Sequence, residues 1–146
     1  MAQAQHRQVV PVPLNNLYET ILDFNSYPRF ASGVKKCEIT GQEGDRTIVR
    51  MEVEMMKRIE YSIAAKGENS GEKAKISWVL KEGDFFQQNN GLWELTRVDD
   101  HSTAVLYSLD LDFSVSVPSF ILKSLIKTTL PKAVDEFAAE TKRRMK

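Results

Sequence analysis

The sequence has little with which to build a disulfide framework, a metal centre or a membrane span. Cys37 is its sole cysteine and has no partner for an internal disulfide, and its two histidines, His6 and His101, show no spacing typical of zinc or iron ligands. No run of 18 apolar residues occurs, and the N-terminus lacks the apolar core of a signal peptide. We therefore expect a cytoplasmic protein without a metal or a cofactor.

An excess of either charge is also missing. Twenty acidic residues balance twenty basic ones, so the composition does not favour nucleic acid as a partner. The 146 residues fit one domain, spanning 1–146, and an apolar content of 42% is enough to bury a core without disulfides or metal. The sequence leaves the oligomeric state open.

The C-terminal stretch 117–146 contains no glycine and has the periodicity of a long amphipathic helix. Pro131 is expected to kink this helix or to restart it, because proline lacks the amide donor of the preceding turn. Residues 117–130 leave two alternatives open: an ordinary core-facing helix, or a lid or patch that contacts a membrane transiently. The apolar stripe comprises Ile121, Leu122, Leu125, Ile126, Leu130, Ala133, Val134, Phe137 and Ala138.

The preceding chain predicts a sheet that can cover such a helix. We expect a first strand over 3–12, a helix over about 14–24, and a one-turn helix over 27–30 with Ser26 as its cap. Alternating apolar and polar residues with turn residues between them indicate an antiparallel meander with one buried face. Its six strands are predicted at about 34–41, 45–56, 58–67, 73–81, 85–97 and 102–115. This order indicates an α+β fold in which a curved sheet of about seven strands wraps around the C-terminal helix.

Two segments resemble a known family. The run Asp23-Phe-Asn-Ser-Tyr-Pro-Arg-Phe30, followed by 34–39, is similar to the opening signature of the polyketide cyclase/dehydrase and coenzyme Q-binding proteins of the START-like (SRPBCC), helix-grip superfamily. The strand 86–96 and the last strand, 105–113, resemble that family's Gly-x-Trp strand and its final strand. Ser32-Gly33 departs from the pattern, since the coenzyme Q branch often has Pro-Trp or Pro-Gly there.

The resemblance implies a cavity between sheet and C-terminal helix that binds a hydrophobic small molecule, such as a lipid, a quinone or a polycyclic metabolite. A carrier without catalytic residues is the leading hypothesis. One alternative is a polyketide cyclase, aromatase or dehydratase, which requires an inward ionisable side chain with a shifted pKa. Another is a macromolecular binder like the ribosome-associated toxins of the family.

We predict that the ligand site is built mainly from aromatic residues, with Tyr61 and Tyr107 as hydroxyl anchors. The polar run 87–90 adds amides, and strand alternation places either Gln88 and Asn90 or Gln87 and Asn89 inward. Gly91 is expected to mark a bulge or close packing. The predicted ligand-binding residues are Phe30, Met51, Tyr61, Trp78, Phe86, Gln88, Trp93, Tyr107, Leu122, Ile126 and Phe137.

Overall fold

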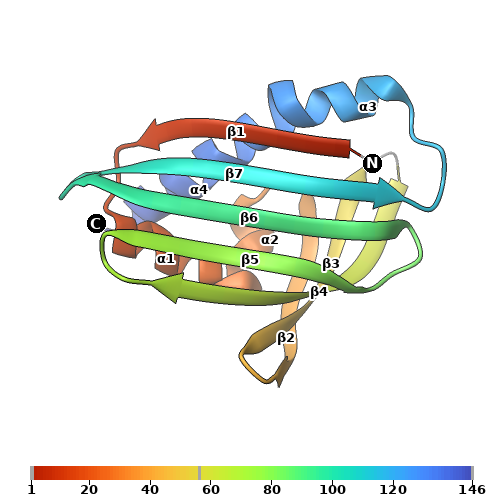
Figure 1. The fold of residues 1–146 in the computed structure, drawn as a ribbon, viewed down its shortest axis with the longest axis horizontal. Coiled ribbons are helices and arrows are strands. Elements are labelled where there is room, and N and C mark those ends of the chain that lie inside the picture. The colour runs from red at the N-terminus through yellow and green to blue at the C-terminus, as the bar shows by residue number, and fades with distance from the viewer. Residues whose placement is uncertain (1, 56, 146) are drawn as a thin grey trace.

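The structure is a computed structural model that describes residues 2–55 and 57–145, with all side chains except those of Ala2, Met55, Leu125 and Ile126. Its strands form one antiparallel sheet in the order β1-β7-β6-β5-β4-β3-β2 (Figure 1). The strands are β1 (Ala2–Val10), β2 (Val34–Glu43), β3 (Arg46–Met55), β4 (Lys57–Asn69), β5 (Lys73–Glu82), β6 (Phe86–Asp99) and β7 (Ser102–Phe113). The predicted antiparallel meander is confirmed, and β1 extends it by pairing with β7.

Two short helices follow β1, as predicted: α1 (Leu14–Leu22) and α2 (Tyr27–Phe30). A 3-10 turn, η1 (Phe24–Ser26), leads directly into α2 and gives Ser26 helical backbone angles, φ −91° and ψ −9°. Ser26 occupies the predicted N-cap position, but its side chain makes no capping hydrogen bond and its hydroxyl donates to Asp23 Oδ2 at 2.7 Å instead.

The C-terminal stretch forms three consecutive helical segments. These are α3 (Ser119–Ser124), a π-helical turn η2 (Leu125–Thr129) and α4 (Leu130–Arg144). Pro131 lies in the first turn of α4, where its missing amide hydrogen costs no helical hydrogen bond, so the predicted restart is confirmed. In Figure 1, α4 lies behind the sheet, whereas α3 lies beyond the β1 edge.

The core fills the space between the sheet, α1 and α4. Val134 and Phe137 of α4 pack with Leu17 and Ile21 of α1 and with inward residues of the strands. The two helices are also joined by a buried hydrogen bond from Thr141 Oγ1 to Thr20 Oγ1 of 2.9 Å. These contacts hold α4 across one end of the sheet.

The first half of the C-terminal stretch is not buried in the core, although its sequence continues the apolar stripe. No residue of α3 is fully buried, and Phe120 is 67% exposed, because α3 has passed the edge of the sheet. The core-facing alternative is therefore wrong for α3. Among the described residues, no helix is long and apolar enough to cross a membrane.

Candidate functional site: a cavity between the sheet and α4

A cavity of about 590 Å³ lies between the inner face of the sheet and the C-terminal helical segments. Strands β3 to β7 form one wall, and η2, α4 and the turn from α2 to β2 form the other. The volume is within the usual range of small-molecule sites, and the walls are mostly apolar. The aliphatic, methionine and aromatic lining residues are Phe24, Tyr27, Ala31, Val34, Met51, Val53, Tyr61, Ile63, Trp78, Phe86, Trp93, Tyr107, Leu109, Leu111, Ala133 and Phe137.

The aromatic part of the wall depends on the glycine at position 91, which has no side chain. Gly91 of β6 pairs with Trp78 of β5, and a Cβ atom built on Gly91 would lie 1.9 Å from Cζ2 of that indole. The indole thus occupies the space of the absent side chain, which confirms the predicted close packing. Nearby, Trp93 and Tyr107 stack with ring centroids 4.1 Å apart and 12° between the planes.

Asn89 is the buried polar residue of this wall. Its side chain lines the cavity, the residue is only 4% exposed, and its Oδ1 atom accepts a hydrogen bond of 3.4 Å from Nε1 of Trp78. An amide so deeply buried requires hydrogen-bond partners, since an unsatisfied one costs about 1–3 kcal/mol. The indole supplies one of them.

Two tyrosine hydroxyls complete the polar group. Burial raises the pKa of Tyr61 above its ordinary value, the neighbouring Tyr107 raises it further, and a hydrogen bond with the Asn89 side chain opposes the rise. Burial alone raises the pKa of Tyr107. Both phenols therefore remain protonated at neutral pH, and the cavity keeps two hydroxyl donors.

The charged lining residues lie at the mouth of the cavity. Both carboxylate oxygens of Glu136 accept hydrogen bonds of 3.3 Å from the backbone N–H of Ser32, which ties α4 to the α2–β2 turn. Lys35 Nζ lies 3.6 Å from Glu54 Oε2, and Lys132 is exposed beside them. The mouth is thus polar and the interior is neutral.

The structure places most predicted site residues in this lining. Those that line the cavity are Met51, Tyr61, Trp78, Phe86, Trp93, Tyr107 and Phe137. Phe30 lies behind the wall, where its ring packs edge-on against Phe137 with centroids 5.0 Å apart. Leu122 packs against a second apolar cluster around Leu111 and Leu130, and the side chain of Ile126 lies outside the described residues.

Gln88 is on the wrong face for the predicted role. Asn89 has the same strand parity as the inward Trp93, so it points inward and Gln88 points outward, whereas the bulge between Phe86 and Gln88 brings Phe86 to the inner face as well. Gln88 Nε2 donates to Oδ2 of Asp110 on the outer face, at 3.4 Å. Of the two predicted alternations, the one that places Asn89 inward is therefore correct for this residue. The bulge lets Phe86 and Asn89 share the inner face, and no turn residue or proline marks its position in the sequence.

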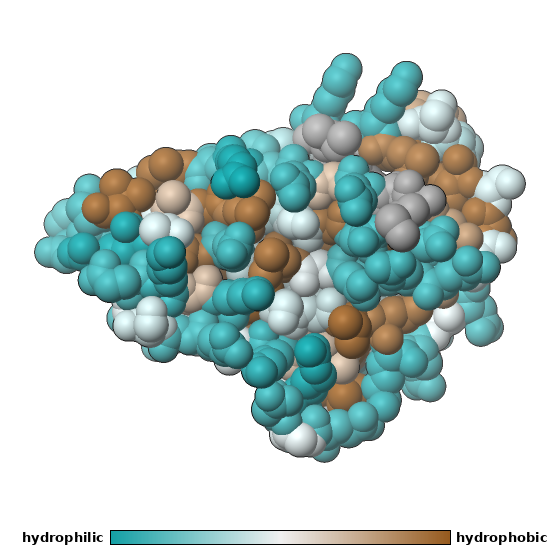
Figure 2. Space-filling view, in the orientation of Figure 1, coloured by the Kyte–Doolittle hydropathy of each residue, from teal (hydrophilic) through white to brown (hydrophobic). Residues whose placement is uncertain are grey.

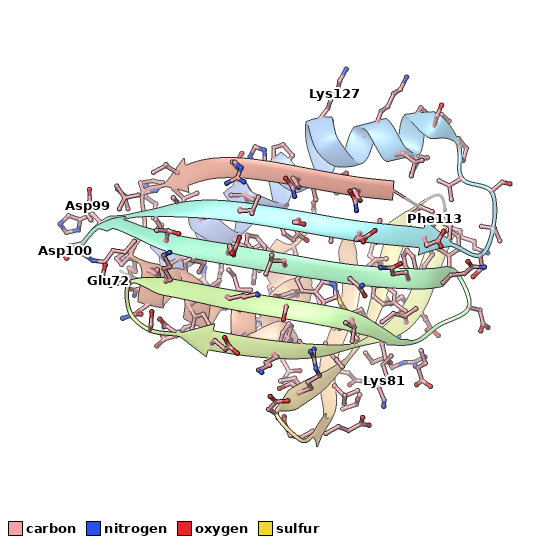
Figure 3. All side chains as sticks on the ribbon, viewed as in Figure 1. Glu72, Lys81, Asp99, Asp100, Phe113 and Lys127 are labelled. Carbon is pink, nitrogen blue, oxygen red and sulfur yellow. The ribbon has the colours of Figure 1, made fainter. Side chains whose placement is uncertain are left out.

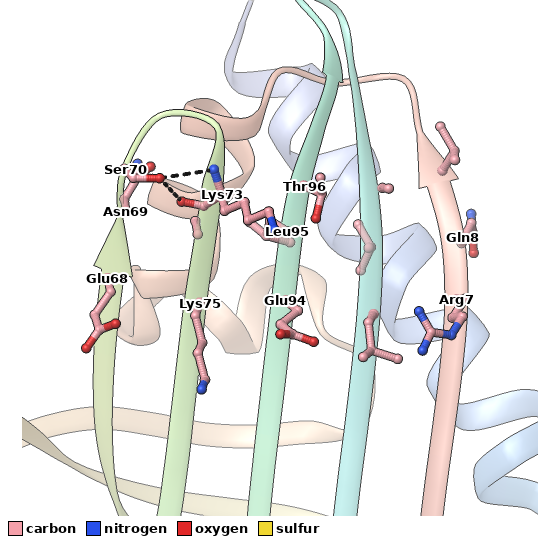
Figure 4. Close-up of a pocket in the computed structure, with 15 residues that line it drawn as sticks. Arg7, Gln8, Glu68, Asn69, Ser70, Lys73, Lys75, Glu94, Leu95 and Thr96 are labelled. Carbon is pink, nitrogen blue, oxygen red and sulfur yellow. Dashed lines mark hydrogen bonds between the residues drawn. The ribbon is translucent and has the colours of Figure 1, made fainter.

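A second hollow, of about 810 Å³, lies on the outer face of the sheet, with the helices behind it (Figure 4). Arg7, Lys75 and Glu94 project from three of its strands, so both charge signs face solvent. Charged and polar side chains make up most of its lining, whereas the lining of the cavity under the sheet is mostly apolar. We therefore assign the candidate site to the inner cavity.

A curved antiparallel sheet closed over a C-terminal helix, with a ligand-sized cavity between them, defines a protein of the helix-grip, START-like class. Residues 10–138 match the model of the family described as polyketide cyclase / dehydrase and lipid transport. The chain belongs to this family. No curated protein is similar enough in sequence to count as a relative.

Solved structures show the same fold at low sequence identity. The Zhui aromatase/cyclase from Streptomyces sp. R1128 is 14% identical with a TM-score of 0.84, covering 99% of this chain and 95% of that one. A START superfamily protein from Mycobacterium smegmatis is 19% identical with a TM-score of 0.83, covering 98% and 99%. Human STARD10 is 13% identical with a TM-score of 0.82, covering 95% of this chain and 62% of that one.

Proposed function

We propose that this protein binds a hydrophobic small molecule in the cavity between the sheet and α4, and that it sequesters or delivers this molecule. The observation that carries the proposal is the cavity of about 590 Å³ with largely apolar walls and a charged mouth. Membership of the family supports it, since hydrophobic ligands are what the family implies. The proposed ligands are lipids, quinones and polycyclic metabolites.

Binding in such a cavity is driven by removing apolar ligand surface from water, which contributes about 25 cal/mol for each Å². The aromatic wall around Trp93 and Tyr107 offers flat surfaces for ring systems. The polar mouth keeps water and charged groups at the entrance, where Lys35, Glu54 and Glu136 lie. A ligand would therefore enter between α4 and the α2–β2 turn, apolar part first.

The test is to purify the protein from its native host, extract it with an apolar solvent, and compare the extract with native mass spectra. We expect one hydrophobic compound in stoichiometric amount and a matching mass difference between the bound and the extracted protein. Repeated extracts without any such compound, from protein whose native mass equals the mass of the chain, would contradict the proposal.

A cyclase or dehydratase acting in the same cavity is the second candidate. It is favoured by Tyr61, an inward ionisable group with a raised pKa beside the polar anchor Asn89. A protonated phenol can donate to a carbonyl oxygen while a ring closes or water is lost. Incubation with an aromatic poly-β-ketone, followed by mass spectrometry, checks this. Water loss that Tyr61→Phe abolishes is the expected result, and turnover equal to that of buffer would exclude it.

For delivery, we propose that residues 117–130 contact an anionic membrane surface. This segment has no carboxylate, although the chain as a whole carries no net charge. Lys123 and Lys127 are exposed, and Lys127 projects away from the protein in Figure 3. Hydrophobic side chains gather at this end of the molecule in Figure 2, and Phe120 is 67% exposed. Thr128 of η2 also lines the cavity, so the segment adjoins the ligand.

A further inference from the structure

We propose that the ligand of the inner cavity ends in a group with one negative charge, a carboxylate, and that Lys132 binds this group at the mouth. The inference rests on the proposed function, because it assigns the chemistry of a molecule in the same cavity. Lys132 lies in the first turn of α4, lines the cavity and is exposed. Its role follows from the balance of charges around the mouth.

The charged residues of the lining are two lysines and two glutamates. Lys35 and Glu54 form an ion pair, with 3.6 Å between Nζ and Oε2. Both carboxylate oxygens of Glu136 accept hydrogen bonds of 3.3 Å from the backbone N–H of Ser32. Lys132 has no ion pair and no side-chain hydrogen bond within the part of the chain that the structure describes. The one charge of the mouth without a partner is therefore positive.

Glu136 is the nearest carboxylate to Lys132 along α4, four residues further on, a spacing that places two side chains on the same side of a helix. Its carboxylate nevertheless binds Ser32 on the α2–β2 turn, and no ion pair joins it to Lys132 in the described structure. A ligand anion at the mouth thus meets an unpaired ammonium group. A ligand cation would have to displace Lys35 from Glu54 or Ser32 from Glu136.

Two threonine hydroxyls lie on the same side of the mouth as Lys132. Thr128 and Thr129 precede Lys132 by four and three residues, and all three residues line the cavity. Both threonines are exposed, and neither hydroxyl bonds to another described residue. A hydroxyl can donate a hydrogen bond to a carboxylate oxygen. This side of the mouth therefore offers one positive charge and two donors.

The inner part of the cavity is unsuited to a charged group. Aromatic side chains such as Trp93 and Phe137 form its walls, and a charge placed among them would lose its hydration without gaining a counter-ion. The negative end of a ligand therefore stays at the mouth while the hydrophobic part lies inside. A single charge matches the one unpaired lysine, whereas a doubly charged phosphate monoester would exceed it.

The experiment compares 4-(2-naphthyl)butanoic acid with the neutral 4-(2-naphthyl)butanamide by calorimetric titration at pH 7, where the acid is ionised. We expect the wild-type protein to bind the acid about fivefold more tightly than the amide, the upper range for a solvent-exposed ion pair. This preference should shrink as the salt concentration rises, because salt screens exposed charges. A third compound, 2-acetylnaphthalene, carries no charge and reports on the cavity alone.

The variants separate the charge of Lys132 from other effects. Lys132→Gln should bring the ratio of the two affinities close to one, Lys132→Glu should reverse it, and Lys132→Arg should preserve it. Lys142→Glu is the matched control, because it changes the net charge equally at an exposed position of α4 outside the cavity lining. It should keep the wild-type ratio. The affinity for 2-acetylnaphthalene should be the same in all of these variants.

Equal affinities for acid and amide in the wild type, or tighter binding of the amide, would overturn this inference. Binding of 2-acetylnaphthalene in the same titrations would then leave the proposed function standing. A preference for the acid that persists in Lys132→Glu would overturn the assignment to Lys132. Failure of all three compounds to bind would overturn the inference and count against the proposed function itself.

Discussion

The indole of Trp78 on β5 fills the space beside Gly91 on β6, where any other residue would carry a side chain. A methyl group at position 91 would lie 1.9 Å from Cζ2 of the indole, well inside van der Waals contact. A side chain at position 91 would therefore displace the indole. The displaced indole would also carry away its Nε1–H, which donates a hydrogen bond to the amide oxygen of Asn89. One glycine therefore governs both the packing of the aromatic wall and its polar group.

Gly91→Ala is expected to lower the free energy of unfolding by about 1–3 kcal/mol, the usual cost of overpacking a well-filled interior. Chemical denaturation followed by tryptophan fluorescence measures this change. Gly41→Ala is the control, because a Cβ atom there meets no heavy atom within 4 Å. If both variants unfold at the same denaturant concentration, the proposed role of Gly91 is wrong.

Filling the cavity from α4 should block ligand binding with little loss of stability. Ala133 lines the cavity, so the large side chain introduced by Ala133→Trp would occupy space meant for a ligand. We expect the affinity for 2-acetylnaphthalene to fall at least about tenfold, that is by about 1.4 kcal/mol. Ala139→Trp places the same side chain on an exposed position of the same helix. An equal loss of affinity in both variants would argue against a site under α4.

The ion pairs at the end of α4 should make the stability of the protein depend on pH in the acid range. Hydrogen bonds from Arg143, and then from Arg144, lower the pKa of Glu140 from 4.5 to about 2, against the opposing effect of burial. Because the folded protein holds this carboxylate more strongly than the unfolded chain does, the stabilisation is complete above about pH 4.5. It is lost as the pH falls towards 2.

Glu140→Gln should therefore destabilise the protein at pH 7 by about 1–3 kcal/mol, the range for a buried hydrogen bond to a charged group. The gap between its melting temperature and that of the wild type should shrink as the pH is lowered from 4.5 to 2. Glu43→Gln removes the carboxylate that pairs with Lys81 at the surface and should have little effect at either pH. A gap for Glu140→Gln that stays constant down to pH 2 would refute the assigned cause.

Membrane contact through residues 117–130 predicts binding to vesicles that contain phosphatidylserine. The double variant Lys123→Gln and Lys127→Gln should bind about tenfold more weakly or worse, since each lysine near an anionic surface contributes about 1 kcal/mol. Sedimentation with vesicles measures this. Lys73→Gln and Lys75→Gln together remove two lysines from the outer face of the sheet and should not change binding. Equal binding of the two double variants would contradict the proposed contact.

Much of the fold could be predicted because its strands alternate strictly. Val49, Met51 and Val53 point inward in β3 as the pattern indicates, and Pro131 restarts the helix as its chemistry requires. The sequence does not show where the sheet ends relative to the helix. For this reason the sequence left open whether residues 117–130 face the core or form an exposed patch, and the structure places α3 beyond the β1 edge.

The site was harder to predict than the fold, because a shift of one residue along β6 changes which side chains face the cavity. Because of the bulge after Phe86, both Phe86 and Asn89 face the cavity while Gln88 faces outward, so the predicted anchor is exchanged for its neighbour. For Trp78, Tyr61 and Tyr107, strand parity was enough to predict an inward side chain, and all three line the cavity; their role in ligand binding stays a prediction. The link between Asn89 and Trp78 could not be predicted, because it depends on the Trp78 indole filling the space beside Gly91 on the neighbouring strand.

The pairing of β1 with β7 has a consequence for biosynthesis. Ala2 lies opposite Leu111, so β1 cannot pair with its neighbour β7 until about a hundred further residues have been translated. Contacts so distant along the chain form late and fold slowly. The nascent chain thus exposes an unsatisfied edge for most of its synthesis, and a chaperone that shields residues 2–10 during this interval would raise the yield of folded protein.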